Sequence, residues 1–247
     1  MTMAQAIAEE RVFVSRSVRY GAILLIIGAV EFVVGMAVTP LGWTTPYSLL
    51  NNQISDLGSV QCGYAYAGTH YACSPWHDIF NASAVLLGLS TIFGSILIRS
   101  AFPARRSRAV ELLLLVVVGV GAVGVGLFPW DANGPAHYSS ALVAFLFGNL
   151  AVLVLGVAML RGARRRVYAV FNVVGGMVGL VALIVYLVLF SSNYGATPGL
   201  GGLERIAVAP ILVWEIVAGM HLLRTPAYGP GHPSIGGRVQ GGDGGPV

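Results

Sequence analysis

The sequence predicts an all-α integral membrane protein: a bundle of six transmembrane helices with both chain ends in the cytoplasm. Three observations predict it. Of the 247 residues, 56% are hydrophobic and only 10% are charged, which is far from the balance that a soluble domain needs to cover its surface. The apolar residues fall in long blocks, without the short alternating runs of a soluble core. The chain has no lysine, and its arginines gather in alternate connections between those blocks.

The six helices follow from the lengths of the apolar blocks. A helix needs about 20 mostly apolar residues to cross a hydrocarbon core about 30 Å thick. The first block follows a run of arginines, as in a signal peptide, but it is too long and lacks a small-residue cleavage site. We therefore predict a membrane domain over residues 20–223. Its helices span residues 20–38, 79–98, 110–128, 140–160, 167–190 and 206–223.

The positions of the arginines predict the orientation of the helices. Cytoplasmic connections of membrane proteins carry an excess of positive charge. Only Arg205 lies in one of the other connections, so residues 39–78, 129–139 and 191–205 are predicted to be extracytoplasmic, in a plasma-membrane protein. The remaining arginines precede the first helix, follow the sixth, or fill the second and fourth connections: Arg11, Arg16, Arg19, Arg99, Arg105, Arg106, Arg108, Arg161, Arg164, Arg165, Arg166, Arg224 and Arg238.

The two ends of the chain are predicted to add little structure. Residues 1–19 form a short cytoplasmic segment. Residues 224–247 are rich in glycine and proline and have almost nothing apolar to bury, so this cytoplasmic tail is predicted to be disordered. The arginine runs are short and lack interleaved aromatic residues, so we expect no nucleic-acid partner.

The two cysteines, Cys62 and Cys73, both lie in the first predicted extracytoplasmic connection. Cysteines that face an oxidising compartment commonly pair, so we predict a disulfide that fastens this long connection. No tight Cys-x-x-Cys spacing exists, which makes metal binding or redox catalysis by the pair a weaker interpretation.

We single out three of the polar side chains that interrupt the apolar blocks. Glu31, Asn149 and Glu215 fall in the first, fourth and sixth predicted helices. A charge in the middle of a bilayer costs at least about 2.5 kcal/mol, so such groups face the protein interior. Counting from the predicted helix ends places both glutamates near the membrane midplane, where the three residues would enclose a polar spot with at least one glutamate protonated. A neutral packing role for them is equally open.

A second polar group gathers where the predicted extracytoplasmic connections meet the helices. Carboxylates and imidazoles at one membrane face can bind a headgroup, act as acid and base, or hold a metal. We interpret Asp56, Asp131 and His137 as candidate catalytic residues. Zinc would need His77 together with Asp131 and His137, but no His-x-x-x-His spacing supports that set, and no cofactor is predicted. The candidate binding residues are Asn52, Ser55, Glu204 and Arg205, with helix capping or a simple ion pair as the alternative for Glu204.

The same residues carry a family resemblance. The string Asn52-Gln53-Ile54-Ser55-Asp56-Leu57-Gly58 and the later elements resemble a prokaryotic six-helix family catalogued as a domain of unknown function, number 998, over residues 20–223. The Ile-Ser-Asp-x-Gly element is more distantly similar to DRAM-like and GPI-lipid-remodelling membrane proteins. The resemblance implies lipid handling, and it marks the positions to test, which are Asn52, Ser55, Asp56, Asp131, His137, Glu204 and Arg205. The later elements are Phe128-Pro129-Trp130-Asp131 with His137, and Glu204-Arg205 with Pro210.

Three hypotheses about function follow. The first is binding or modification of a membrane lipid headgroup at the extracytoplasmic polar residues, which agrees with the absence of any nucleotide-binding loop. The second is a small proton-coupled transporter that uses Glu31 and Glu215, although no inverted repeat is evident. The third is a non-catalytic scaffold or regulatory subunit that acts as a homo-oligomer or with another membrane protein.

Overall fold

The computed structural model describes residues 14–65, 70–102, 105–161, 166–192 and 199–225. Most of the predicted amino-terminal segment and nearly all of the predicted tail lie outside these residues. The helices are α1 Arg16–Val38, α2 His77–Ile98, α3 Arg105–Leu127, α4 Gly134–Arg161, α5 Arg166–Ser191 and α6 Leu200–Arg224. Between α1 and α2 lie two 3-10 turns, Thr39–Gly42 and Ser55–Gly58, and a hairpin of β1 Gly63–Ala65 and β2 His70–Ala72, in which Tyr64 pairs with Tyr71.

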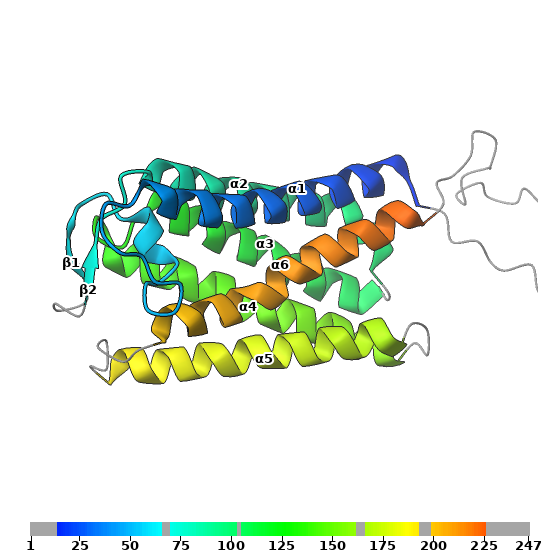
Figure 1. Cartoon of the computed structure of the whole chain (residues 1–247). Helices are drawn as coiled ribbons and strands as arrows, with labels where there is room; N and C mark the ends of the chain where they lie inside the picture. The colour runs from blue at the N-terminus through cyan, green and yellow to red at the C-terminus, as the bar shows by residue number, and fades with distance from the viewer. Residues whose placement is uncertain (1–13, 66–69, 103–104, 162–165, 193–198, 226–247) are drawn as a thin grey trace, which may run out of the picture.

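All six helices are long and apolar enough to cross a membrane, so the predicted all-α bundle of six helices is confirmed and the protein is a multi-pass membrane protein. Their outward faces are apolar: Ile27 is 56% exposed, Phe93 55% and Leu113 64%. In a soluble protein such faces would be an aggregation hazard, whereas lipid tails cover them at no cost. The helix α5 is the least buried of the six, and it lies along one side of the bundle (Figure 1).

All six helices begin earlier than the sequence predicted, and α4 and α6 do so by six residues each. The helix α4 begins at Gly134, because the Asn133 side chain accepts the backbone N–H of Ala136 and Pro135 suits a first turn. The helix α6 begins at Leu200. His137, Glu204 and Arg205 were predicted in connections and instead lie in helices, His137 in the first turn of α4 and the other two in the second turn of α6. Polar residues near a helix end can remain close to the membrane surface.

The two ends of the bundle differ in what covers them (Figure 1). We call the end that carries the connection 39–76 and its hairpin the capped end. The other end, where α1 begins and α6 finishes, is the arginine end, since Arg99, Arg161, Arg166 and Arg224 lie there. Helices that follow one another in sequence pack side by side, and α6 packs against α1, α4 and α5, so the helices form a closed arrangement around an interior.

Small residues fix the register between α2 and α3. A Cβ added to Gly88 would lie 2.4 Å from the carbonyl oxygen of Gly119, and one added to Gly126 would lie 2.3 Å from that of Asn81. Such backbone contact is the usual way for membrane helices to gain van der Waals energy. These two contacts determine which residues of the antiparallel helices α2 and α3 lie at the same height along the bundle axis, including the height of Glu111.

Candidate functional site

The motif that follows α1 folds back into the capped end of the bundle. Gln53 is 1% exposed and Asp56 is fully buried, although both are polar. The chain can turn there because Asp56 Oδ2 accepts the backbone N–H of Gln53 at 2.8 Å, which starts the 3-10 turn Ser55–Gly58. Two side chains of the next elements hold the turn from outside: Ser74 donates to the Leu57 carbonyl, and Asn81 donates to the Gly58 carbonyl. Residues 52–58 therefore fill the capped end from inside, and we call this segment the plug.

Asp56 also pairs with a histidine that the hairpin supplies. His70 Nε2 lies 2.7 Å from Asp56 Oδ2, and 22% of the His70 side chain is exposed. The disulfide between Cys62 and Cys73 closes the hairpin at its base and so fixes His70 beside the carboxylate. This disulfide confirms the predicted pairing. A carboxylate joined to an imidazole can accept a proton from a hydroxyl or amine that binds beside it.

Glu204 and Arg205 bind the plug from α6. Glu204 is 5% exposed, and its Oε2 accepts the backbone N–H of Ile54. Arg205 donates through Nη1 to the carbonyls of Asn52 at 2.8 Å and Gly201 at 2.9 Å, and through Nη2 to the hydroxyl of Tyr47. The pair therefore acts mainly on the plug's backbone, and it is not a simple ion pair.

Tyr47 completes the cover over Arg205. The guanidinium carbon of Arg205 lies 5.8 Å from the centre of the Tyr47 ring, within range of a cation–π contact. Burial raises the pKa of Tyr47 to about 12, although Arg205 acts in the opposite direction. The Tyr47 hydroxyl thus remains protonated at neutral pH and accepts the hydrogen bond from Arg205.

Asp131 and His137 lie beside the plug at the junction of α3 and α4. Asp131 Oδ2 accepts the backbone N–H of Gln61 at 2.7 Å. His137 is 3% exposed, and its Nδ1 lies 2.8 Å from the Phe128 carbonyl oxygen. In the neutral ring this bond places the hydrogen on Nδ1 and leaves Nε2 as an acceptor. The charges of Asp131 and Asp56 both act on His137, so the three predicted catalytic residues share one neighbourhood.

One detail of this neighbourhood bears on ligands. Asp56 Oδ1 and Asp131 Oδ1 are buried, and neither accepts a hydrogen bond within the described part of the chain. Buried acceptors without donors are unusual and costly. In the described ranges, no group of three His, Cys, Asp or Glu side chains is placed to hold a metal ion. The alternative set of His77, Asp131 and His137 is thus not assembled, and His77 bonds to Ser74 and Asp78 instead.

Comparison with known families supplies an identity. Residues 26–221 match the family model described as protein of unknown function (DUF998). The chain belongs to this family. No curated protein and no solved structure matches it. The family resemblance drawn from the motifs is thereby confirmed, and every polar residue described above lies inside the DUF998 match.

The interior polar residues of this DUF998 protein do not meet in one spot, contrary to the sequence-based expectation. Glu31 Oε1 accepts from Ser83 at 2.6 Å, Glu215 Oε1 lies 2.7 Å from Thr91 Oγ1, and Asn149 donates to the carbonyls of Phe145 and Ala207. Ser83 and Thr91 are eight residues apart on α2, which is about 12 Å along the helix axis. Glu31 and Glu215 do not lie at the same depth in the membrane, because α6 begins before the predicted boundary.

The structure also brings in residues that sequence reasoning missed. At the capped end these are Tyr47, His70 and Tyr186, the last of which donates to the Gln53 side chain. No spacing in the sequence links them to the motif, so only the fold identifies them. In the interior the missed residue is Glu111, which is fully buried. A lone carboxylate inside an apolar block of this DUF998 chain was the available signal.

Proposed function

We propose that the capped end binds the headgroup of a membrane lipid that carries a primary amine. One observation supports this most: the two buried carboxylate oxygens Asp56 Oδ1 and Asp131 Oδ1 accept no hydrogen bond within the described residues. A protonated amine has a positive charge and three N–H donors, which is the complement of two unsatisfied carboxylate oxygens. His137, on which both carboxylates act, would border the bound group.

The charge balance of the capped end favours the same ligand class. Among the described residues there, four carboxyl groups face a single guanidinium: Asp56, Asp78, Asp131 and Glu204 against Arg205. Arg205 already donates to two carbonyls and to Tyr47, so it has little left for a phosphate. An anionic group without an amine would therefore meet net repulsion at this end.

The surroundings suit a lipid. Exposed aromatic side chains collect at the capped end, among them Tyr64, Trp76 and Tyr138, and such residues typically lie at the level of lipid headgroups. Positive charge at the opposite end supports the proposal that the capped end faces out of the cell. The Cys62–Cys73 disulfide agrees with an oxidising outer compartment.

Native mass spectrometry of the protein with defined lipids tests the proposal. Phosphatidylethanolamine has a primary amine, phosphatidylcholine has a quaternary amine without N–H donors, and phosphatidylglycerol has none. We expect the first to remain bound at collision energies that release the other two. Equal retention of all three lipids would contradict an amine site.

Substitutions identify the site. Asp131→Asn should weaken the retention of phosphatidylethanolamine about tenfold, since it removes one charge-assisted hydrogen bond. Asp78→Asn is the matched control, because Asp78 is a carboxylate of the same end whose side chain is 94% exposed. If Asp131→Asn binds phosphatidylethanolamine as the unmodified protein does, the carboxylate has no part in recognition.

The proposed orientation has its own test. Single cysteines placed at Tyr64 and at Val167, which are 74% and 86% exposed at opposite ends, can be labelled in intact cells after Cys62 and Cys73 are replaced by serine. We expect an impermeant maleimide to label the first position and spare the second. The reverse pattern would place the capped end in the cytoplasm and remove the extracytoplasmic lipid site.

A further inference from the structure

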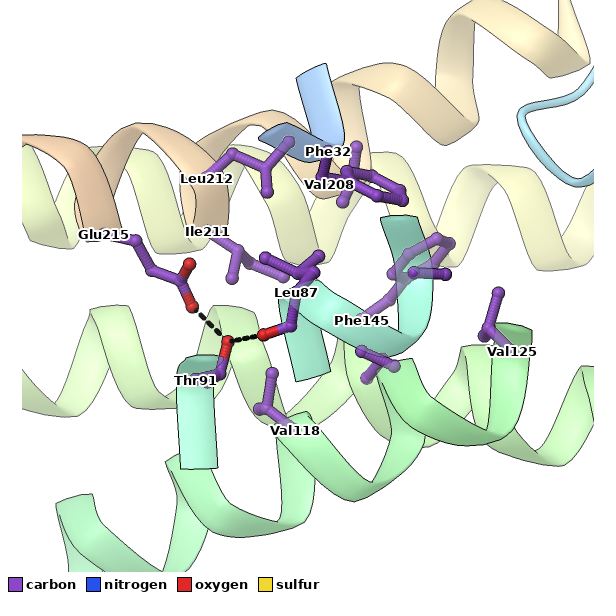
Figure 2. Close-up of a pocket in the computed structure, with 13 residues that line it drawn as sticks. Phe32, Leu87, Thr91, Val118, Val125, Phe145, Val208, Ile211, Leu212 and Glu215 are labelled. Atoms are coloured by element: carbon purple, nitrogen blue, oxygen red, sulfur yellow. Dashed lines mark hydrogen bonds between the residues drawn. The ribbon is translucent and has the colours of Figure 1, made fainter. Parts of the chain in front are cut away.

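A small cavity of about 50 Å³ lies in the interior of the bundle, among five of its helices (Figure 2). It is separate from the capped end and almost entirely apolar. The exceptions are Thr91 and Glu215. Its other lining residues come from α1, α2, α3, α4 and α6: Phe32, Ala84, Leu87, Val118, Ala122, Val125, Ala144, Phe145, Val208, Ile211 and Leu212. Its volume has room for about four water molecules.

The hydrogen bonds at Glu215 indicate a protonated carboxyl group. Thr91 Oγ1 lies 2.7 Å from Glu215 Oε1 and 2.9 Å from the Leu87 carbonyl oxygen (Figure 2). The threonine hydroxyl has only one hydrogen, and a carbonyl oxygen can only accept. Both contacts become hydrogen bonds when Glu215 donates its proton to Thr91 and Thr91 donates to Leu87. A carboxylate in this apolar surrounding would instead be a buried charge without a counter-charge.

The second oxygen of Glu215 is available to the cavity. Glu215 is 1% exposed, and its Oε2 is buried with no hydrogen-bond partner among the described residues. Since Glu215 itself lines the cavity, a water molecule there can bond to Oε2. The carboxyl group thus has one oxygen held by Thr91 and one that can exchange a proton.

Glu111 continues the series toward the arginine end. It is fully buried, and both of its carboxyl oxygens lack a partner within the described part of the chain. It lies one and two helical turns before Leu115 and Val118, and Val118 lines the cavity. The register set by Gly88 and Gly119 places Glu111 level with residue 96 of α2, about 7 to 8 Å beyond Thr91 along the axis.

The α6 helix links the same cavity to the capped end. Glu204, Val208, Ile211 and Glu215 follow one another at the spacing of a single helix face. Val208 and Ile211 line the cavity between the two glutamates. Glu204 therefore lies at the capped end, Glu215 at the cavity and Glu111 nearer the arginine end. Glu204 itself does not line the cavity.

We propose that Glu215 and Glu111 relay protons through the bundle, with water in the cavity exchanging protons with Glu215 on the side that faces the polar cluster at Glu204. Each step moves one proton from a carboxyl oxygen to a water or carboxyl acceptor and breaks no other bond. The relay does not depend on lipid binding, and its residues differ from those of the proposed headgroup site except for Glu204.

Proteoliposomes that contain a pH-sensitive dye test the relay. With a potassium diffusion potential as driving force, we expect the unmodified protein to acidify the lumen faster than protein-free vesicles do. Glu215→Gln and Glu111→Gln should each reduce the rate to that of protein-free vesicles, while Asp78→Asn should leave it unchanged. The relay is excluded if the unmodified protein adds no proton flux, or if Glu215→Gln retains the full rate.

A second measurement needs no variant and so does not depend on refolding. Dicyclohexylcarbodiimide adds to a protonated carboxyl group in an apolar site, where the O-acylisourea that forms rearranges to a stable N-acylurea. We expect mass spectrometry to find this adduct on Glu215, and the proton flux to fall in proportion to the labelling. Absence of the adduct, or full flux in the labelled protein, would overturn the proposal.

Discussion

Carboxyl groups at the capped end and in the middle of the bundle are bonded in different ways. At the capped end, Asp56 and Glu204 accept backbone N–H groups, and Asp56 also bonds to an imidazole. In the middle, Glu215 has only a threonine hydroxyl that is itself engaged with a carbonyl, and Glu111 has no partner among the described residues. A backbone N–H can only donate to a carboxyl oxygen, whereas the Thr91 hydroxyl can also accept a proton from a carboxylic acid.

The difference separates two kinds of role. Carboxylates that accept backbone N–H groups fasten the plug and shape a rigid end of the molecule. Carboxyl groups without fixed donors make no such contact with the plug, and in the proposed relay they are the groups that change protonation. Each of the following predictions tests one side of that contrast, beginning with the largest expected effect.

Removal of the disulfide should affect the capped end and leave the interior intact. Replacing Cys62 and Cys73 by serine should cost about 3 kcal/mol, because a closed loop of this length restricts the unfolded chain. We expect faster hydrogen exchange in residues 59–65 and 70–76, and no change in α3 or α4. Equal acceleration in all helices would mean that the hairpin and the bundle are one cooperative unit.

A methyl group at Gly201 should push the plug out of the bundle. The added Cβ would lie 2.0 Å from the Asn52 carbonyl oxygen, and the carbonyl cannot move without losing Arg205. Overpacking of this kind costs about 1–3 kcal/mol, so Gly201→Ala should lower the unfolding temperature in detergent. Gly63→Ala is the control, since nothing lies within 4 Å of its added Cβ; equal effects of the two would show that the contact is unimportant.

Replacement by glutamine should lower the free energy of unfolding more at Glu204 than at Glu215. At Glu204 it exchanges a charge-assisted bond to the Ile54 N–H for a neutral one, which costs about 1 kcal/mol. At Glu215 the amide N–H₂ can replace the acid O–H as donor to Thr91, so the expected cost is close to zero. Chemical denaturation in detergent measures both, and a larger loss for Glu215→Gln would mean that Glu215 is ionised.

The titration of Tyr47 should make the smallest contribution to stability, and that contribution should change only at high pH. Its pKa rises from 10.0 to about 12 on folding, so the folded protein holds the phenol proton more tightly than the unfolded chain does. This stabilisation is present below pH 10 and is lost as the pH rises through 12. The difference in unfolding temperature between the unmodified protein and Tyr47→Phe should therefore become smaller between pH 10 and pH 12. A difference that stays constant over this range would show that the titration of Tyr47 does not cause it.

The sequence alone determined the solvent and the number of helices. Lipid excludes unpaired backbone polar groups, so each long apolar block has to become a helix, and block lengths can be counted directly. It also determined the cysteine pair and marked Asp56, Asp131 and His137 as one group. The sequence predicted the helix ends less well, because His137 and Glu204 are polar residues that the first two turns of a helix tolerate near the membrane surface.

Only the tertiary structure decided which side chains meet. The pairing of His70 with Asp56 depends on a hairpin, and the level of Glu111 depends on glycine contacts between α2 and α3. Hydropathy reports how far a residue lies along its own helix, whereas contacts between helices depend on register and rotation. That is why Glu31 and Glu215, assigned to one polar spot from the sequence, bond to hydroxyls about 12 Å apart along α2.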